Sequence, residues 1–169
     1  MAETAVLLAS GADRPGVMDD LSQFLLEFGG NISDSRSVNL HGQFALLLLV
    51  RAEKSAMNLI GTKLTRLEDV GIHARLIPAD EFHHPQTDTF PHIFIASGKD
   101  QSGVLHRISH LLRSVKVNID DLQTRVFADG SFEIRLSLAV PRETPITHLR
   151  DYLSYLCTEL NIKGELKEA

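Results

Sequence analysis

The sequence predicts an α+β fold with two tandem copies of one βαββαβ unit, because it contains a long internal repeat and the same order of elements in each copy. The segment Val6–Val17 returns as Ile93–Val104 with the same arrangement of apolar residues, glycines and an aspartate. The shift between the copies is 87 residues (100 − 13 = 87 for Asp13 and Asp100). A repeat of this length is a complete folding unit, so a site in one copy has a counterpart in the other.

The hydrophobic pattern of the first copy predicts six elements. An apolar run short enough for a strand is followed by turn residues, and apolar residues then recur at helical spacing until Gly29-Gly30, which suits a helix end. His41-Gly42 separates two strand-like segments, as in a hairpin. A second amphipathic stretch ends at Gly71 before a last strand. The expected ranges are strand 5–9, helix 17–28, strand 31–40, strand 44–50, helix 57–67 and strand 72–77.

The second copy repeats this order, with Asn161 in the place of Gly71, because asparagine tolerates a left-handed conformation next best after glycine. Its expected strands are 93–97, 119–127, 132–140 and 162–166, and its expected helices are 104–115 and 146–160. The order βαββαβ is the ferredoxin-like arrangement. We therefore expect a first domain at residues 1–80, a linker at 81–91 that contains prolines and little periodicity, and a second domain at 92–169.

Composition and charge limit the possible partners. The chain is 43% hydrophobic and 23% charged, with a formal net charge of −5 and no run of basic residues. We therefore expect no direct binding to nucleic acid or to an acidic membrane surface. One cysteine excludes an intrachain disulfide, and no apolar run reaches the length of a membrane span. With no basic segment at the N-terminus, the sequence predicts a cytoplasmic protein.

The sequence favours a protein that is not an enzyme and that holds no metal or cofactor. His106 and His110 have the spacing of a metal-binding pair on a helix, but no third ligand lies nearby in the sequence, so we expect them on a solvent-exposed helix face. The linker pair His83-His84 has the same interpretation. Cys157 continues a stripe of leucines and is expected in the core rather than as a nucleophile. No phosphate loop, zinc spacing or catalytic triad is present in the sequence.

The second strand of each predicted hairpin differs between the copies. In the second copy, Phe132–Leu138 alternates apolar and polar residues, as in a strand with one wet face. In the first copy, Ala45, Leu47 and Leu49 take the polar positions. We expect the second domain or another chain to cover this stripe, and we predict self-association of the chain, most simply as a homodimer.

The most informative local pattern is Asp13-Arg14-Pro15-Gly16, which returns as Asp100-Gln101-Ser102-Gly103 between a strand and a helix. Free N–H groups at a helix N-terminus suit a carboxylate, and the glycines leave room for it. The aspartates, with Asn31 and Asn118, could accept hydrogen bonds from an ammonium group, so a free amino acid is a possible ligand. The alternative is a tight turn in which the aspartate only caps the helix.

Asp-Arg-Pro-Gly-Val after an apolar strand, followed by a helix and Gly-Gly-Asn-Ile, resembles an ACT domain. Two such domains with nothing else attached resemble the glycine cleavage system transcriptional repressor family. This resemblance implies a ferredoxin-like fold and amino-acid binding at interfaces between paired domains. The second copy departs from the pattern with Gln101-Ser102 and with Lys116-Val117 in place of Gly29-Gly30, so we expect Asp100 to matter less than Asp13. The residues expected to bind ligand are Gly11, Asp13, Gly16, Asn31, Gly98, Asp100, Gly103 and Asn118.

Together these features predict a regulatory protein that senses a small amino acid and acts through a protein partner. Without a visible helix-turn-helix, any control of transcription of glycine cleavage or related amino-acid metabolism would be indirect. Two other interpretations stay open: a detached regulatory subunit of an enzyme of amino-acid or one-carbon metabolism, and a dimerisation module that has lost its ligand.

Overall fold

The structure, a computed structural model, describes residues 1–79 and 88–169. The chain divides into two compact units, with the division between residues 84 and 85. The expectations for residues 80–87, which include most of the predicted linker and the His83-His84 pair, lie outside the described residues. Among the described helices, none has the length and apolar character needed to span a membrane.

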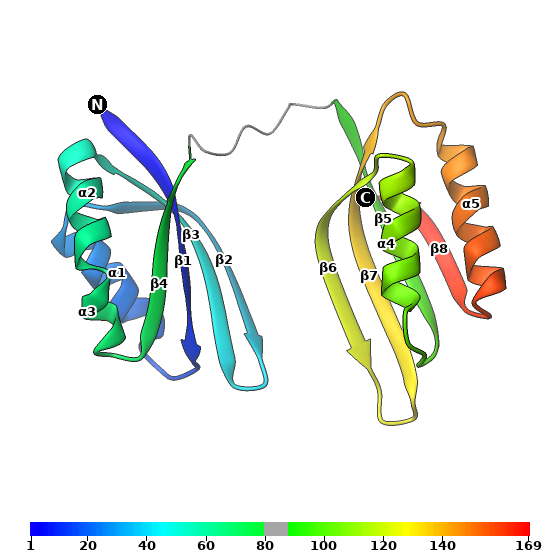
Figure 1. The fold of residues 1–169 in the computed structure, drawn as a ribbon, viewed down its shortest axis with the longest axis horizontal. Coiled ribbons are helices and arrows are strands. Elements are labelled where there is room, and N and C mark those ends of the chain that lie inside the picture. Colours follow the sequence, from blue (N-terminus) through cyan, green and yellow to red (C-terminus); the bar gives the residue numbers. More distant parts are fainter. Residues whose placement is uncertain (80–87) are drawn as a thin grey trace. The chain divides into compact units, whose positions relative to one another are not determined.

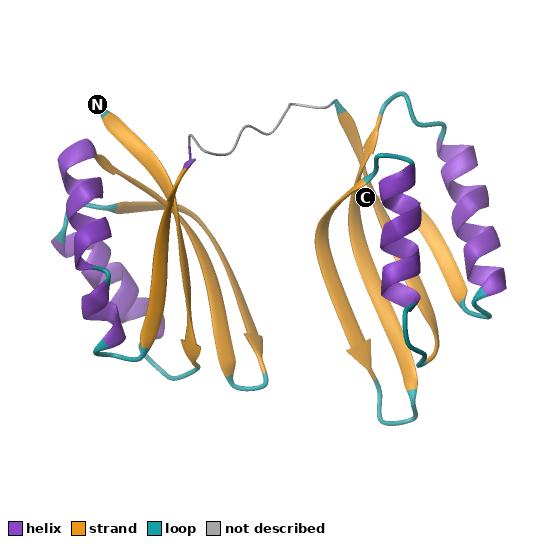
Figure 2. Ribbon diagram, in the orientation of Figure 1, coloured by secondary structure: helices purple, strands orange, loops and turns teal. Residues whose placement is uncertain are grey.

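The first unit has the predicted βαββαβ order, with strands longer than the apolar runs that predicted them (Figure 1). Its sheet has the order β2-β3-β1-β4, every neighbouring pair is antiparallel, and the helices lie on one face of the sheet (Figure 2). Its elements are β1 Ala2–Ala12, α1 Val17–Glu27, β2 Asn31–Leu40, β3 Gln43–Glu53, α2 Lys54–Lys63, α3 Thr65–Glu68 and β4 Ile72–Pro78.

The single helix predicted at 57–67 is divided into two helices in the structure. α2 begins at Lys54, three residues earlier than predicted, and Leu64 separates it from α3. The amide of Leu67 donates to the carbonyl oxygen of Leu64 at 3.0 Å, so the chain tightens to a three-residue turn there. Hydrophobic spacing did not detect the break, because Met57, Ile60 and Leu67 still pack into the same core.

The second unit repeats the architecture, with sheet order β6-β7-β5-β8 and its helices on one face (Figures 1 and 2). β5 begins at Thr89, so the last three residues of the predicted linker are strand. These residues pair with β7 alone, and pairing with β8 begins at His92, which places Pro91 where a strand tolerates proline. The elements are β5 Thr89–Lys99, α4 Val104–Ser114, β6 Asn118–Val126, β7 Ser131–Pro141, α5 Ile146–Glu159 and β8 Lys163–Glu168.

The extra residue of the second copy lies in its hairpin turn. In the first unit, His41 and Gly42 form a two-residue turn with φ of 50° and 75°, the left-handed values of a type I′ turn. In the second unit, the amide of Phe127 donates to the carbonyl oxygen of Ser131 at 2.8 Å, which leaves three residues in the turn. The insertion therefore lengthens a surface turn and leaves the register of the strands unchanged.

One hydrophobic core in each unit lies between the helices and one face of the sheet. In the first unit Leu7 and Leu48 meet Leu21 of α1, and in the second Leu136 meets Ile108 of α4; all five are fully buried. Cys157 of α5 lies in the second core, as predicted, and burial raises the pKa of its thiol. The prediction of an α+β, ferredoxin-like fold in both copies is confirmed.

Candidate functional site

The loop between the first strand and first helix has the same backbone conformation in both units. Gly16 and Gly103 precede α1 and α4 with φ of 93° and 88°, values that a side chain with a Cβ rarely adopts. Neither helix receives a side-chain hydrogen bond at its first turn. The N-terminal amide groups of both helices are therefore free of a side-chain cap, which is the arrangement that can accept a carboxylate.

The aspartates of these loops are not helix caps. The Asp13 carboxylate accepts a hydrogen bond from the Asn39 side chain, and the Asp13 amide donates to the Gly42 carbonyl oxygen at 2.8 Å. The alternative that Asp13 simply caps α1 is therefore wrong for this structure. The Asp100 amide donates to the Gly130 carbonyl oxygen at 2.9 Å, so the backbone of each aspartate is bonded to the adjacent hairpin turn, and neither aspartate caps its helix.

Asn39 is a contact that the sequence analysis missed. Asn39 lies near the end of β2, and its counterpart in the second unit is Val126, which has no side-chain hydrogen-bonding group (126 − 39 = 87). The Asp100 carboxylate consequently has no side-chain partner among the described residues. The sequence shows that Asn39 is a polar residue just before the hairpin turn. Only the pairing register of β2 with β3 places it beside the Asp13 loop.

The replacement of Arg14 by Gln101 preserves the attachment of the loop. Arg14 donates from Nη2 to the Val70 carbonyl oxygen at 2.9 Å, and Gln101 donates from Nε2 to the Leu160 carbonyl oxygen at 2.8 Å. Both acceptors lie in the turn before the last strand of their unit. The departure of the second copy from the Asp-Arg-Pro-Gly pattern therefore does not detach its loop.

The two helix N-termini differ in the acidic residues of their first turns. The first turn of α1 contains Asp19 and Asp20, whereas the first turn of α4 contains no acidic residue. Acidic side chains already stabilise the positive end of the helix dipole and repel an incoming carboxylate. Arg14 offsets Asp20 through an ion pair at 2.5 Å, so Asp19 is the acidic charge of α1 that has no counterpart at the N-terminus of α4.

Gly11 and Gly98 have a packing role in the strands. A Cβ at Gly11 would lie 2.4 Å from the backbone oxygen of Gly71, and a Cβ at Gly98 would lie 2.9 Å from Cγ2 of Ile162. In each unit the glycine lets the end of the first strand approach the start of the last strand. The close backbone approach explains both glycines without a ligand.

The asparagines lie far from the loops. In the strand register Asn31 is level with Thr4, nine positions before Asp13 along the first strand. At roughly 3.3 Å per residue the two positions are about 30 Å apart. The same register separates Asn118 from Asp100. A ligand in one unit cannot touch both, so the expectation that Asn31 supports a ligand at the loop of its own domain is wrong.

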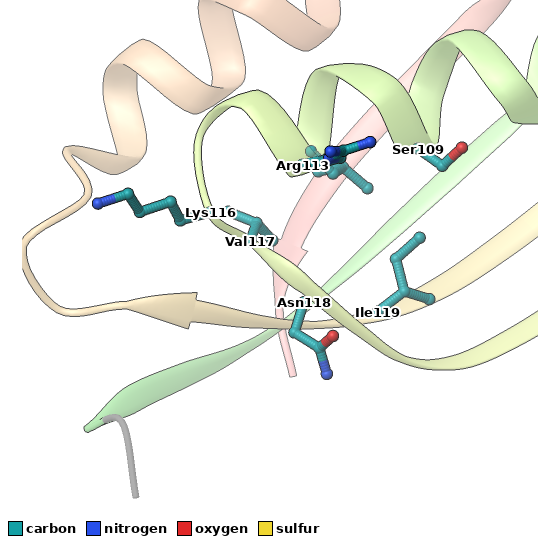
Figure 3. A pocket seen from close by; sticks show the side chains of 7 residues that line it. Ser109, Arg113, Lys116, Val117, Asn118 and Ile119 are labelled. Atoms are coloured by element: carbon teal, nitrogen blue, oxygen red, sulfur yellow. The ribbon is translucent and has the colours of Figure 1, made fainter. Parts of the chain in front are cut away.

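Asn118 lines a shallow hollow of about 370 Å³ between the end of α4 and the start of β6 (Figure 3). Its amide donates to Asp120 at 2.7 Å, and Arg113 and Lys116 lie on the helix side. The Lys116 side chain points away from Asn118 in Figure 3, so the cations do not converge on the asparagine. The hollow therefore does not combine with the distant Asp100 loop into one site.

The two histidines of α4 lie on its exposed face. His106 and His110 are exposed on α4 with ring centroids 6.2 Å apart, which confirms their predicted solvent-facing position. Within residues 1–79 and 88–169, no group of three or more His, Cys, Asp or Glu residues is arranged to hold a metal ion.

Comparison with known proteins assigns the fold to a family. The model of the ACT domain family matches residues 3–76, which is almost the whole of the first unit. The first unit is an ACT domain. The second unit has the same strand order and the same loop conformation, so the chain carries two βαββαβ repeats of the ACT type in tandem.

Relatives extend the likeness to the full chain. The glycine cleavage system transcriptional repressors of Escherichia coli (strain K12) and Shigella flexneri are each 24% identical to it over 167 residues, covering 95% of this chain and 87% of each relative. A crystal structure of a candidate glycine cleavage system transcriptional repressor has a TM-score of 0.75 at 23% identity, covering 99% of this chain and 97% of that one. A protein of Galdieria sulphuraria has a TM-score of 0.81 at 23% identity, covering 100% and 99%. The tandem arrangement is thus a shared fold.

Proposed function

We propose that this chain is a non-enzymatic regulatory protein that binds a small amino acid at its ACT-type loops and controls a partner protein. The observation that carries the proposal is the pair of uncapped helix N-termini, each preceded by a left-handed glycine and an exposed aspartate. The amide groups suit the ligand carboxylate, and the aspartate carboxylate suits its ammonium group. Because Gly16 and Gly103 have no side chains, a small ligand can approach the backbone at these positions.

The regulated process is proposed from the relatives. Proteins named glycine cleavage system transcriptional repressor match nearly the whole chain, which supports a role in controlling glycine cleavage or related amino-acid metabolism. The net charge of −5 and the absence of a basic stripe in the sequence favour control through a protein rather than by direct contact with DNA. The ligand-bound chain would therefore act on a protein partner.

We place the stronger carboxylate site in the second unit. The first turn of α4 has no counterpart of Asp19, the aspartate of α1 that Arg14 does not pair with, and the Asp100 carboxylate is not held by a side chain such as Asn39. This assignment revises the expectation that Asp100 matters less than Asp13. Both loops remain candidate sites, with the affinity of the second expected to be higher.

Calorimetric titration with glycine, alanine and serine tests the proposal. Wild-type protein should bind at least one of them, and Asp100→Ala should weaken the tighter class of site by about tenfold, as expected for loss of a charged hydrogen bond. Because no side chain holds Asp100 in the described structure, its removal should leave the folding stability nearly unchanged.

The Asn39→Ala variant is the matched control for Asp13→Ala. Both variants remove the hydrogen bond between Asn39 and Asp13, but only Asp13→Ala removes the carboxylate. Binding in the first unit should survive in Asn39→Ala and fail in Asp13→Ala. Equal affinity in wild type, Asp13→Ala and Asp100→Ala would place the ligand elsewhere and refute the proposed site.

A further inference from the structure

The open face of the first sheet, on the side away from the helices, is apolar along β3, where the matching strand β7 of the second sheet carries charged and polar residues. Its centre consists of Leu47 and Leu49 of β3 beside Leu8 and Val6 of β1. Leu47 is 48% exposed and Leu8 is 39% exposed within the described structure. The predicted stripe of Ala45, Leu47 and Leu49 does lie on this face, and no element of the first unit covers it.

The second sheet provides the comparison. Glu133, Arg135 and Ser137 occupy the positions of Ala45, Leu47 and Leu49 and pair with the same neighbours of the central strand. Two domains with one fold and one register thus differ in the chemistry of this face. Burial of the leucines should contribute roughly 25 cal/mol per Å² of apolar surface, whereas burial of the second face would also desolvate Glu133 and Arg135 beside Ile93 and Ile95.

Charged residues border the leucines in a definite order. Across the sheet, one row reads Arg36, Leu47, Leu8 and Arg75, and the next row reads Asp34, Leu49, Val6 and Ile77. Asp34 and Arg36 are therefore adjacent on the open face of β2. Neither forms an ion pair in the described part of the chain, whereas Arg14 and Arg66 of the same unit both do.

We propose that the first ACT domain pairs face to face with the first ACT domain of a second copy, about a two-fold axis that crosses the strands between these two rows. This symmetry lays Leu47 of each copy on the partner's Leu49, and Arg36 of each copy opposite the partner's Asp34. Two identical ion pairs then lie next to each other where the β2 strands meet, along one edge of the apolar centre. A two-fold axis along the strands would instead place Arg36 opposite the partner's Arg75, which is repulsive.

The proposed ion pairs between Arg36 and Asp34 can still form when the two sheets are twisted relative to each other. Packed sheets lie about 10 Å apart and cross at about 30°. β2 is the outer strand, roughly 7 Å from the middle of a four-stranded sheet with strands about 4.8 Å apart, so this crossing shifts it by about 4 Å. A flexible arginine side chain can span such a shift. Arg75 and Arg51 remain at the rim, where their guanidinium groups can reach water.

The contact area sets the strength of the dimer. The four strands and the rows between Ala45 and Arg51 cover on the order of 400 Å² per copy, from strand spacings of about 4.8 Å and rises of about 3.3 Å. This is below the area of a standard stable interface, so the dimer should be weak and dependent on concentration. Oligomeric state must therefore be measured over a range of concentrations.

Sedimentation velocity of the full chain tests the proposal, with variants that exchange the charges of Asp34 and Arg36. Because the interface is weak, the protein concentration should range from about 1 to 200 μM. Wild type should shift from monomer to dimer over this range. Arg36→Asp and Asp34→Arg should each raise the dissociation constant by about tenfold, because each places like charges together. The double variant Asp34→Arg/Arg36→Asp should restore the wild-type dissociation constant.

The second sheet offers the matched control. Gln123 occupies the position of Arg36 (123 − 36 = 87), so Gln123→Asp places an aspartate at the matching position of the second sheet, which is not part of the proposed interface. It should leave the dissociation constant unchanged. A wild-type monomer at all concentrations would overturn the proposal, as would single variants that dimerise like wild type. A double variant as weak as the singles would overturn the symmetry, and circular dichroism confirms that each variant is folded.

Discussion

Replacing Gly11 by alanine tests whether the glycines that precede the loops are packing residues. The new Cβ would lie 2.4 Å from the Gly71 oxygen, a backbone atom that cannot move away as a side chain can. Overpacking of this kind typically costs 1–3 kcal/mol, and we expect about 2 kcal/mol of lost stability in the first domain. For a domain of this size that corresponds to a fall in melting temperature of about 10 °C.

The same substitution at Gly61 is the control in the same domain. Gly61 lies within α2, without positive φ, and its Cβ would meet only Leu76 at 3.8 Å. Alanine favours a helix over glycine, so Gly61→Ala should stabilise the domain by about 0.5–1 kcal/mol. Urea unfolding followed by circular dichroism, with hydrogen exchange at β1 amides to locate the change, measures both. If Gly11→Ala unfolds like wild type or becomes more stable, the packing explanation is refuted.

Two further predictions concern the charges of the first domain. Arg66 lowers the pKa of Glu27 through a hydrogen bond, so the contribution of this pair to stability is present at neutral pH and is lost as the pH falls through the lowered pKa. The stability difference between wild type and Arg66→Gln in urea should therefore shrink in acid, where only the contact of Arg66 with the Phe28 ring remains, and a difference that stays the same or grows there would contradict this reasoning. Asp19→Asn removes an acidic group from the first turn of α1 and should raise the affinity of the first loop for an amino acid by about twofold to fivefold. Titration in an Asp100→Ala background isolates that site, and an unchanged or lower affinity would count against the dipole argument.

The fold could be predicted from the sequence because its signals are local and occur twice. Gly29-Gly30 and Gly71 marked the helix ends, and His41-Gly42 marked the hairpin turn. The strand ends were less accurate, since β1 and β5 extend beyond their apolar runs through pairing with neighbouring strands. Propensity within a segment does not report such pairing.

The candidate site could be predicted only in part. The loop conformation followed from the glycines, and both loops adopt it. The grouping of Asn31 with Asp13 failed, because an asparagine close to the loop in sequence is carried by α1 to the opposite end of the sheet. The hydrogen bond of Asn39 to Asp13 was missed for the same reason: it joins residues that only the register of β2 and β3 brings together.

The central claim is that a free amino acid binds the native chain at its loops, and a thermal-shift panel of the twenty amino acids tests it most directly. Binding to the native state alone should add about 2.7 kcal/mol of stability at a hundredfold excess over the dissociation constant. We predict that at least one small amino acid at millimolar concentration raises the melting temperature of wild type. The double variant Asp13→Ala/Asp100→Ala should lose that rise. No shift with any of the twenty, or an undiminished shift in the double variant, would contradict the account.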